Sequence, residues 1–267
     1  MSRKIQVPFV TKEWLIENWI NTDKSLNDLS IEIGVNSSLL ETRASRLGLR
    51  KEFKHSINKE KLLDFSNPNV CYLAGLLATD GYLNTNSDFV SLTLVGESEE
   101  KLLEDILSYF ESTDVVRQYR INNSEKIRNS IRISCRGIKS FLFENFNIPA
   151  KDKTSLLGFP ETFFNEDCKK AFLLGCFDGD GCISHFSRRS PTATLLTKSQ
   201  KFIDGLYDTI SSIEDVSCKK GIEKGYPYVR IGGKINVKNF LDWMYSSTSV
   251  LRLERKYEKY LWVKDIV

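Results

Sequence analysis

A nine-residue stretch occurs twice in this sequence and constrains the fold more than any other feature. The first copy, residues 73–81, reads LAGLLATDG, and the second, residues 173–181, reads LLGCFDGDG. Asp80 and Asp180 occupy matching places, 180 − 80 = 100 residues apart. An internal repeat of this length indicates a duplicated structural unit, with each copy long enough for a small α/β fold.

Each copy is an apolar helical run with small residues four positions apart. These are Gly75 and Thr79 in the first copy and Gly175 and Gly179 in the second. Glycine inside a helix costs up to about 1 kcal/mol relative to alanine. Small residues at this spacing allow two helix backbones to approach closely. We therefore predict that the two copies pack against each other.

The acids at the end of each copy point to metal-dependent chemistry. Asp80 and Asp180 stand in a last helical turn, where they face the negative end of the helix dipole. Two such helices side by side would bring the carboxylates together, where like charges repel. Because a hard divalent cation such as Mg²⁺ relieves both effects, we expect both acids to be catalytic and metal-binding. A lone Asp-Gly more commonly marks a turn, so the pairing carries this inference.

Both copies resemble the motif that names the LAGLIDADG homing endonucleases, and two copies in one chain resemble its monomeric branch. The resemblance covers roughly residues 67–267. It implies an α+β fold with two pseudo-symmetric αββαββα repeats that form a saddle of antiparallel sheets. It also implies a monomer that cleaves double-stranded DNA at specific sites with Mg²⁺ or another divalent cation. The first copy departs from the family at Ala78, whereas the second keeps an acid at Asp178.

Hydrophobic periodicity predicts the same order of elements in both halves. In the first half it predicts strands at 82–83, 89–94, 115–121 and 127–135, and helices at 98–110 and 138–145. In the second half it predicts strands at 182–186, 193–197, 216–222 and 226–231, and helices at 202–213 and 237–245. Arg132 and Arg230 match at a spacing of 98 residues, which supports repeats over 67–159 and 160–267.

Residues 1–66 are predicted to form a separate all-α unit. Three short helices, with a turn at Gly34 before the last one, fit a helix-turn-helix arrangement. The third predicted helix, 37–47, carries Arg43 and Arg46, which we expect to contact DNA in the major groove. The alternative is a plain three-helix bundle that contacts another protein.

Antiparallel sheets can leave one face uncovered, and here that face is predicted to be polar and basic. Two such faces side by side would form one groove for double-stranded DNA, with the acids at its centre. The expected DNA-binding residues of the two repeats are Arg117, Arg120, Arg128, Arg132, Arg188, Arg189, Lys220 (with Lys219 as the alternative), Tyr228 and Arg230. For any one of these side chains, a solvated strand face is an adequate explanation, and only their repetition suggests a binding surface.

The resemblance also implies assisting residues near the acids. The family has a polar or basic residue just after the second strand of each repeat, at positions that match Glu97 and Lys198. It also has a lysine after the closing helix of each repeat. Lys151 or Lys153 could fill that place in the first half, and Arg255 or Lys256 in the second. We take Lys198 and Lys151 as the expected catalytic lysines.

Composition limits the other possibilities. The net charge of +3 (38 basic minus 35 acidic residues) is a weak argument for nucleic-acid binding, so local patches must carry that argument. Six cysteines without a CxxC pair, and only two histidines, argue against a zinc site or a disulfide scaffold. With no signal peptide or membrane-length apolar run, we expect the cytoplasm or an organelle interior, and no membrane partner.

Two alternative functions fit the same scaffold. One is an RNA maturase that binds intron RNA and assists its folding, which no residue here excludes. The other is a regulator that only binds DNA. Because such a regulator needs no pair of metal-binding acids, the presence of both Asp80 and Asp180 argues against it.

Overall fold

A computed structural model describes residues 9–22, 24, 26–49, 56–96, 99–120, 126–184 and 190–266. The chain divides into two compact units, residues 1–54 and 55–267, and each is described by itself. The boundary predicted at residue 66 is too late. The Asn58 amide donates to the Phe110 carbonyl at 2.9 Å, and Leu62 is buried in the core of the second unit.

The first unit is helical. It contains α1 (Lys12–Leu15), which continues into a π-helical turn (Ile16–Ile20), followed by α2 (Leu26–Glu32) and α3 (Ser37–Arg46). A small apolar core joins them, formed by Val10, Leu15, Trp19, Leu29, Leu40 and Ala44. Gly34, at φ +69°, turns the chain between α2 and α3, and the Asn36 side chain caps α3. The three predicted helices are therefore present.

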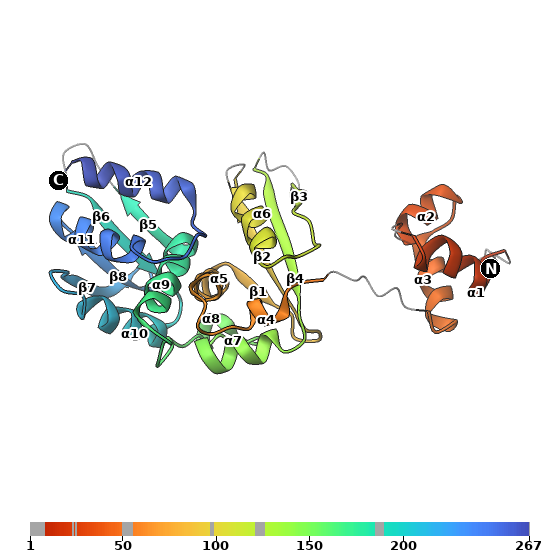
Figure 1. Cartoon of the computed structure of the whole chain (residues 1–267), viewed down its shortest axis with the longest axis horizontal. Coiled ribbons are helices and arrows are strands. Elements are labelled where there is room, and N and C mark those ends of the chain that lie inside the picture. Colours follow the sequence, from red (N-terminus) through yellow and green to blue (C-terminus); the bar gives the residue numbers. More distant parts are fainter. Residues whose placement is uncertain are drawn as a thin grey trace. The chain divides into compact units, whose positions relative to one another are not determined.

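The second unit contains two repeats of the same order (Figure 1). The first comprises α4 (Lys59–Leu62), α5 (Pro68–Thr79), β1 (Gly81–Leu83), β2 (Phe89–Val95), α6 (Glu99–Tyr109), β3 (Arg117–Tyr119), β4 (Arg128–Ser134), α7 (Ile138–Phe146) and α8 (Lys153–Leu156). The second comprises α9 (Glu166–Asp180), β5 (Gly181–Ser184), β6 (Thr192–Leu196), α10 (Gln200–Ser211), β7 (Cys218–Glu223), β8 (Tyr226–Gly232), α11 (Lys234–Tyr245) and α12 (Glu254–Asp265).

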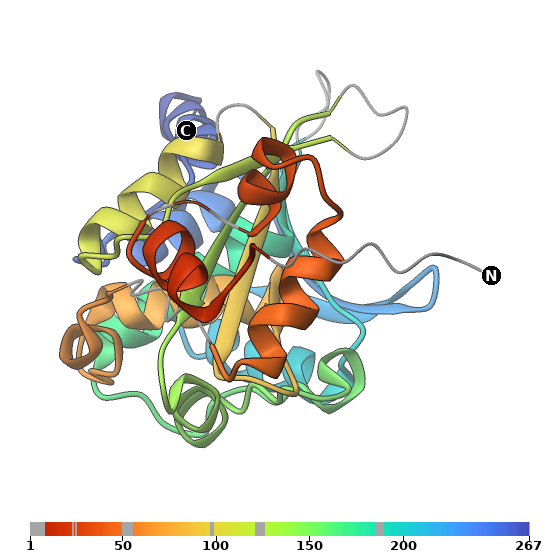
Figure 2. The same ribbon diagram turned by 90° about the vertical axis from the view of Figure 1, so that its right-hand side faces the viewer.

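Each repeat builds one four-stranded antiparallel sheet, with strand orders β1-β2-β4-β3 and β5-β6-β8-β7. The long strands β2 and β4 lie side by side in the first sheet (Figure 2). Alternate residues of the strands are buried under the helices: Ile131 and Val229 are fully buried, while Arg132 and Arg230 lie on the other face. The predicted α+β architecture with two antiparallel sheets is confirmed.

The two motif helices, α5 and α9, pack together in the middle of this unit (Figure 1). Their backbones approach so closely that a Cβ atom on Gly75 would lie 2.1 Å from the Phe172 carbonyl oxygen. A Cβ atom on Gly175 would lie 2.0 Å from the Tyr72 carbonyl oxygen. The predicted helix-to-helix contact is therefore present, and glycine is required on both sides of it.

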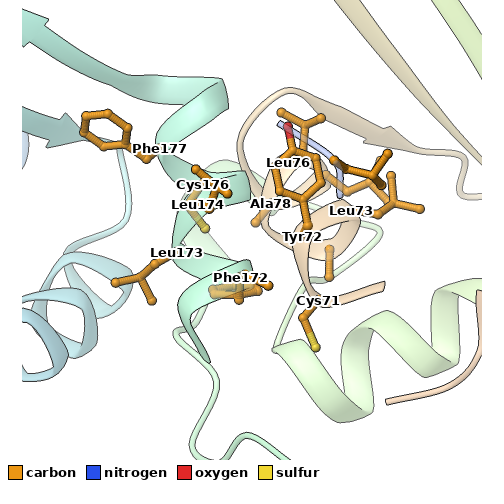
Figure 3. Close-up of a cluster of buried hydrophobic side chains, with 14 of the residues drawn as sticks. Cys71, Tyr72, Leu73, Leu76, Ala78, Phe172, Leu173, Leu174, Cys176 and Phe177 are labelled. Atoms are coloured by element: carbon orange, nitrogen blue, oxygen red, sulfur yellow. The ribbon is translucent and has the colours of Figure 1, made fainter. Parts of the chain in front are cut away.

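Apolar side chains fill the space around this contact (Figure 3). Leu173 and Phe177 point away from α5, and they meet Leu195 and Val229 of the second sheet. Both motif helices are thus buried nearly all round, which makes them the core of the unit. The helices α4, α8 and α12 were not predicted from the sequence.

We expect Gly175→Ala to lower the free energy of unfolding by about 3 kcal/mol, because the added methyl group overlaps the backbone of α5. Urea unfolding followed by circular dichroism measures this change. Gly232→Ala is the matched control, since no heavy atom lies within 4 Å of the Cβ position there. Equal unfolding midpoints for the two variants would contradict the close approach.

Candidate active site

Asp80 and Asp180 lie together where α5 and α9 end. Asp80 is the C-cap of α5, and Asp180 is the last residue of α9. A Cβ atom on Gly179, the residue before Asp180, would lie 3.2 Å from Asp80 Oδ2. Glycine at this position therefore leaves room for the Asp80 carboxylate beside the end of the neighbouring helix.

The surroundings of the two carboxyl groups favour protonation. Burial is the main cause that raises the pKa of Asp80, although the positive charges of Lys256, Lys153 and Arg255 act against it. Burial, followed by repulsion from Asp80, raises the pKa of Asp180 to about 6. Two carboxylates held together at neutral pH are the donor set that a hard divalent cation prefers.

Two buried lysines close the C-terminal ends of the motif helices. Lys153, at the start of α8, donates hydrogen bonds from Nζ to the carbonyl oxygens of Leu77, Thr79 and Gly81. Lys256, in α12, donates to those of Phe177, Asp178 and Gly179. The Leu77 and Phe177 carbonyls also accept from the backbone amides of Asp80 and Gly181, so each ammonium group adds a donor to a set of carbonyls at the negative end of a helix dipole.

Both lysines are also close to the acids. Burial lowers the pKa of Lys153 to about 8, against the attraction of Asp180 and Asp80. Burial likewise lowers the pKa of Lys256 to about 8, with Asp178 as the main opposing charge. The lysine expected at this place in the first repeat was Lys151. That prediction is wrong, because Lys151 is exposed before α8 and Lys153 is the one that turns inward.

Asp178 joins three helices. Its Oδ2 atom accepts a hydrogen bond of 2.8 Å from the Tyr72 hydroxyl of α5 and another of 2.8 Å from the Leu253 amide at the start of α12. Burial raises its pKa to about 6, while the nearby Lys256 ammonium is the main influence that favours the charged form. This carboxylate therefore positions α12, which carries Lys256, against the motif helices.

A second cation on α12 is held by an acid from the first repeat. Arg255 Nε donates to Glu99 Oε1 at 2.6 Å, and Glu99, the first residue of α6, is only 3 % exposed. The sequence analysis did not predict this ion pair, because its partners are 156 residues apart in the sequence. No sequence periodicity predicts a contact at that separation.

A cavity of about 240 Å³ opens beside Asp180. Lys153 and Lys198 both line it, so the structure brings the predicted Lys198 beside Asp180 together with Lys153 in place of Lys151. Its other lining residues are Ala78, Thr79, Thr154, Leu157, Leu196, Thr197 and Tyr226. Tyr226 was not predicted as a site residue, although its position at the start of β8, next to the β7–β8 turn, could have suggested it.

The predicted polar faces of the sheets carry many of the expected side chains. In the first sheet Arg128 and Arg132 share this face with Arg117, which forms an ion pair of 2.5 Å with buried Asp114. Arg132 stacks over the Phe89 ring at 3.7 Å. Arg120 is exposed just after β3. Pairing and stacking of this kind fix the direction of long side chains.

In the second sheet Arg230 is held by three neighbours. It donates to Thr194 Oγ1 at 3.1 Å and to Glu223 Oε2 at 2.6 Å, and it stacks over the Tyr228 ring at 4.6 Å. The Tyr228 hydroxyl lies over Gly221, where a Cβ atom would be only 2.8 Å away. These residues form the second polar face.

The placement of Lys220 on this face is wrong. Lys220 pairs in register with buried Val229, and its ammonium forms an ion pair of 2.7 Å with Asp204 of α10 on the helix-covered side. Lys219 pairs with Arg230 and lies on the polar face instead. Alternation counted from Cys218, which packs against the core, could have assigned the two lysines correctly.

The remaining predicted residues are placed as follows. Arg188, Arg189 and Glu97 lie outside the described residues. In the first unit Arg46 is exposed on α3, and Arg43 donates from Nε to the Val10 carbonyl at 3.1 Å. Arg43 therefore helps to hold the N-terminal segment, which limits its freedom to contact a ligand.

The described residues contain neither a metal-binding cluster of side chains nor an apolar helix of membrane-spanning length. Within them, no cluster of three or more His, Cys, Asp and Glu side chains could hold a metal ion. A metal at Asp80 and Asp180 would thus have two protein carboxylates and would need oxygens from elsewhere, as Mg²⁺ sites that also bind substrate phosphates do. None of the described helices combines the length and the apolar character that crossing a membrane requires.

Comparison with known proteins gives the same fold. Residues 167–244 match the family described as LAGLIDADG-like domain. The structure is similar to the homing endonuclease I-WcaI bound to its DNA recognition sequence, with a TM-score of 0.52 and 14 % identity over 75 % of this chain and 91 % of that one. The N-terminal LAGLIDADG domain of DUF199/WhiA aligns with a TM-score of 0.47 and 16 % identity over 79 % of this chain and 98 % of that one. No curated protein matches the sequence.

The fold of the second unit is therefore a duplicated αββαββα unit with two motif helices at its centre. This chain has the LAGLIDADG homing endonuclease family fold, with both motif copies in one polypeptide.

The stability of the metal-free protein should depend on Asp180. Its folded-state pKa of about 6 exceeds its ordinary value of 3.8, so the free energy of unfolding decreases as the pH rises between these values. We expect Asp180→Asn to melt at a higher temperature than the parent above pH 6, by roughly 2–4 °C, the shift that about 1 kcal/mol produces in a domain of this size. At pH 4 the difference should vanish.

Thermal unfolding in EDTA from pH 4 to pH 8 measures this difference. Asp208→Asn, at an exposed position on α10, is the matched control and should follow the parent at every pH. A difference between Asp180→Asn and the parent that does not change with pH would mean that Asp180 is not an electrostatically strained group.

Proposed function

We propose that the protein is a site-specific endonuclease that cleaves both strands of duplex DNA with a divalent metal ion. The observation that supports this most directly is the pair of acids at adjacent helix ends, next to a cavity lined by Lys153 and Lys198. Burial raises the pKa values of both carboxyl groups, as is common for acids in active sites.

Each of these residues has a separate role in the proposed reaction. Asp80 and Asp180 would hold the divalent cation, which when bound activates water and stabilises the leaving oxygen of a phosphodiester. Lys153 and Lys198 place positive charge where the negative charge of the phosphate group develops. Lys256 and Asp178 fix the ends of α9 and α12, so that the acids keep their positions.

The polar faces of the two sheets are the surface proposed for DNA. Arg128, Arg132 and Arg230 present guanidinium groups, which can bind guanine edges or phosphates in the major groove. Lys219 replaces Lys220 in this proposal, because only Lys219 is on the polar face. Ion pairs with Asp114 and Glu223 hold Arg117 and Arg230 in fixed directions, which favours specific rather than general contacts.

Two other functions remain as competing proposals. An RNA maturase would use the same scaffold to bind intron RNA, and a regulator would only bind DNA. The raised pKa of Asp180 argues against the regulator, because a protein without a metal would gain nothing from two carboxylates that destabilise each other. Filter binding with intron RNA and with duplex DNA separates the maturase from the nuclease.

Incubation with a randomised duplex library and Mg²⁺, followed by sequencing of the cut ends, tests the proposal. We expect Asp80→Asn and Asp180→Asn each to abolish cleavage and to leave duplex affinity in EDTA nearly unchanged, because the change removes a metal ligand but no DNA contact. Asp208→Asn should cleave like the parent. A parent protein that binds a selected duplex but never cuts it would refute the nuclease.

The first unit is proposed to add DNA contacts through α3. Arg46 is exposed there, beside the exposed polar residues Glu41 and Thr42. We expect Arg46→Glu to weaken binding of long duplexes and to reduce the slope of log affinity against log salt by about 1, the effect of losing one phosphate contact. Lys12→Glu, an exposed charge on α1, is the matched control. Equal slopes for both variants would favour a protein-contact module.

A further inference from the structure

Two arginines occupy equivalent places on the polar faces of the two sheets. In the first sheet, the residue that follows the motif pairs with Ser91, and Ser91 pairs with Arg132. In the second sheet, the residue that follows the motif pairs with Thr194, and Thr194 pairs with Arg230. Each arginine is therefore two strands away from the strand that continues its own motif helix. A duplex bound along both faces would meet the two side chains at matching positions on either side of the paired acids.

The guanidinium group of Arg132 is held in place but keeps its donors. It lies over the Phe89 ring, with 3.7 Å between Cζ and the ring centroid, and the side chain is exposed. Within the described residues, it has no carboxylate partner and no hydrogen-bond acceptor. An aromatic ring fixes the plane of a guanidinium without occupying its N–H groups. Its five donors therefore remain available as a rigid fork, which matches the O6 and N7 acceptors of guanine.

The guanidinium group of Arg230 is already engaged. Nε donates to Thr194 Oγ1 at 3.1 Å, and Nη2 donates to Glu223 Oε2 at 2.6 Å, so two of its three nitrogens have acceptors. The Glu223 carboxylate also lies next to any base that would meet this arginine. Because O6 and N7 of guanine are both acceptors, a neighbouring carboxylate repels them. Arg230 is therefore poorly suited to bind guanine through two hydrogen bonds.

The strand register shows which residues cause this difference. Glu223 stands opposite the residue four positions before Arg230. In the first sheet, Tyr119 stands opposite the residue four positions before Arg132, so a tyrosine takes the place of the carboxylate. Phe89 stands opposite the residue two positions after Arg132, where the second sheet has a threonine. The first sheet thus has a stacking ring and lacks the competing acid at these positions.

Given the endonuclease proposed above, we propose that the two halves of its target site differ in one defined base pair. Arg132 binds O6 and N7 of a guanine in the half-site that lies on the first sheet, so this position is fixed. Arg230 contributes positive charge at the matching position of the other half-site, where guanine is not required. Arg132 is therefore a specificity-determining residue, and the target is not palindromic at these two positions.

Selection from a randomised duplex library for binding in EDTA measures base preference without any cleavage. In the enriched duplex, we expect one strongly preferred guanine, whose replacement by adenine weakens binding by roughly 30-fold, the effect of losing a bidentate base contact. Arg132→Lys keeps the charge but loses the fork, so it should reduce this preference to less than about three-fold and leave the other preferences unchanged. A guanine preference that survives in Arg132→Lys overturns the proposal.

Arg230→Lys is the matched variant at the equivalent position of the second sheet. We expect it to weaken binding of all enriched duplexes alike and to change no base preference by more than about three-fold, because charge is the contribution of this residue. Loss of a guanine preference in Arg230→Lys would show that both arginines read bases, which overturns the asymmetry. A uniform loss of affinity in Arg132→Lys would make that residue a phosphate contact and overturn the base contact.

Base analogues test the contact atoms. At the fixed position, 7-deazaguanine removes N7 and should weaken binding of the parent by roughly ten-fold and of Arg132→Lys by less than about three-fold. Inosine keeps O6 and N7 and lacks the minor-groove amino group, so it is the matched control and should bind like guanine. If inosine weakens binding as much as 7-deazaguanine does, the contact is not in the major groove and the proposal fails.

These outcomes are separable from those of the proposed function. An enriched duplex that shows the Arg132-dependent guanine but is never cut with Mg²⁺ refutes the nuclease and supports the base contact. A duplex that is cut, with base preferences that Arg132→Lys does not change, overturns this inference alone. If no duplex is enriched, both the site-specific nuclease and this inference are wrong.

Discussion

The close approach of α5 and α9 is the constraint on which the rest of the structure depends. At Gly75 and Gly175 each helix backbone lies against a carbonyl of the other, with no space for a side chain. Because the helices cannot separate or slide without losing this fit, their C-terminal ends stay together and Asp80 stays beside Asp180. The strands β1 and β5 begin at the next residues, so the orientation of both sheets follows from the same contact.

This arrangement concentrates polar groups in a place where burial is expensive. The carbonyls at two helix ends meet two carboxylates whose pKa values are raised. Lys153 and Lys256 offset the cost of burying these groups by donating to the carbonyls, and each brings a positive charge close to the acids. The same two lysines therefore stabilise the fold and influence the pKa values of the two acids.

The sequence was sufficient where a periodic pattern carried the information. The repeat predicted the helix pair and the acids, and strand alternation predicted the polar faces with Arg132 and Arg230. It failed where position depends on a single turn or on a distant partner. Lys153 rather than Lys151 faces inward because the chain turns through a left-handed conformation at Asp152, φ 50°, which no periodicity reveals. Lys220 was misplaced because it is adjacent to Lys219 in the edge strand β7, where the partly buried Cys218 is the residue that marks the inner face. The Glu99–Arg255 pair joins elements from different repeats.

The hydrogen bond between Tyr72 and Asp178 makes the two repeats non-interchangeable. The equivalent positions, Phe172 and Ala78, are both apolar and buried. A hybrid built from two second repeats would oppose each Asp178 with a phenyl ring that cannot donate, and one built from two first repeats would oppose each phenol with a methyl group. The duplicated halves have thus become complementary surfaces, comparable to a matched heterodimer fused into one polypeptide.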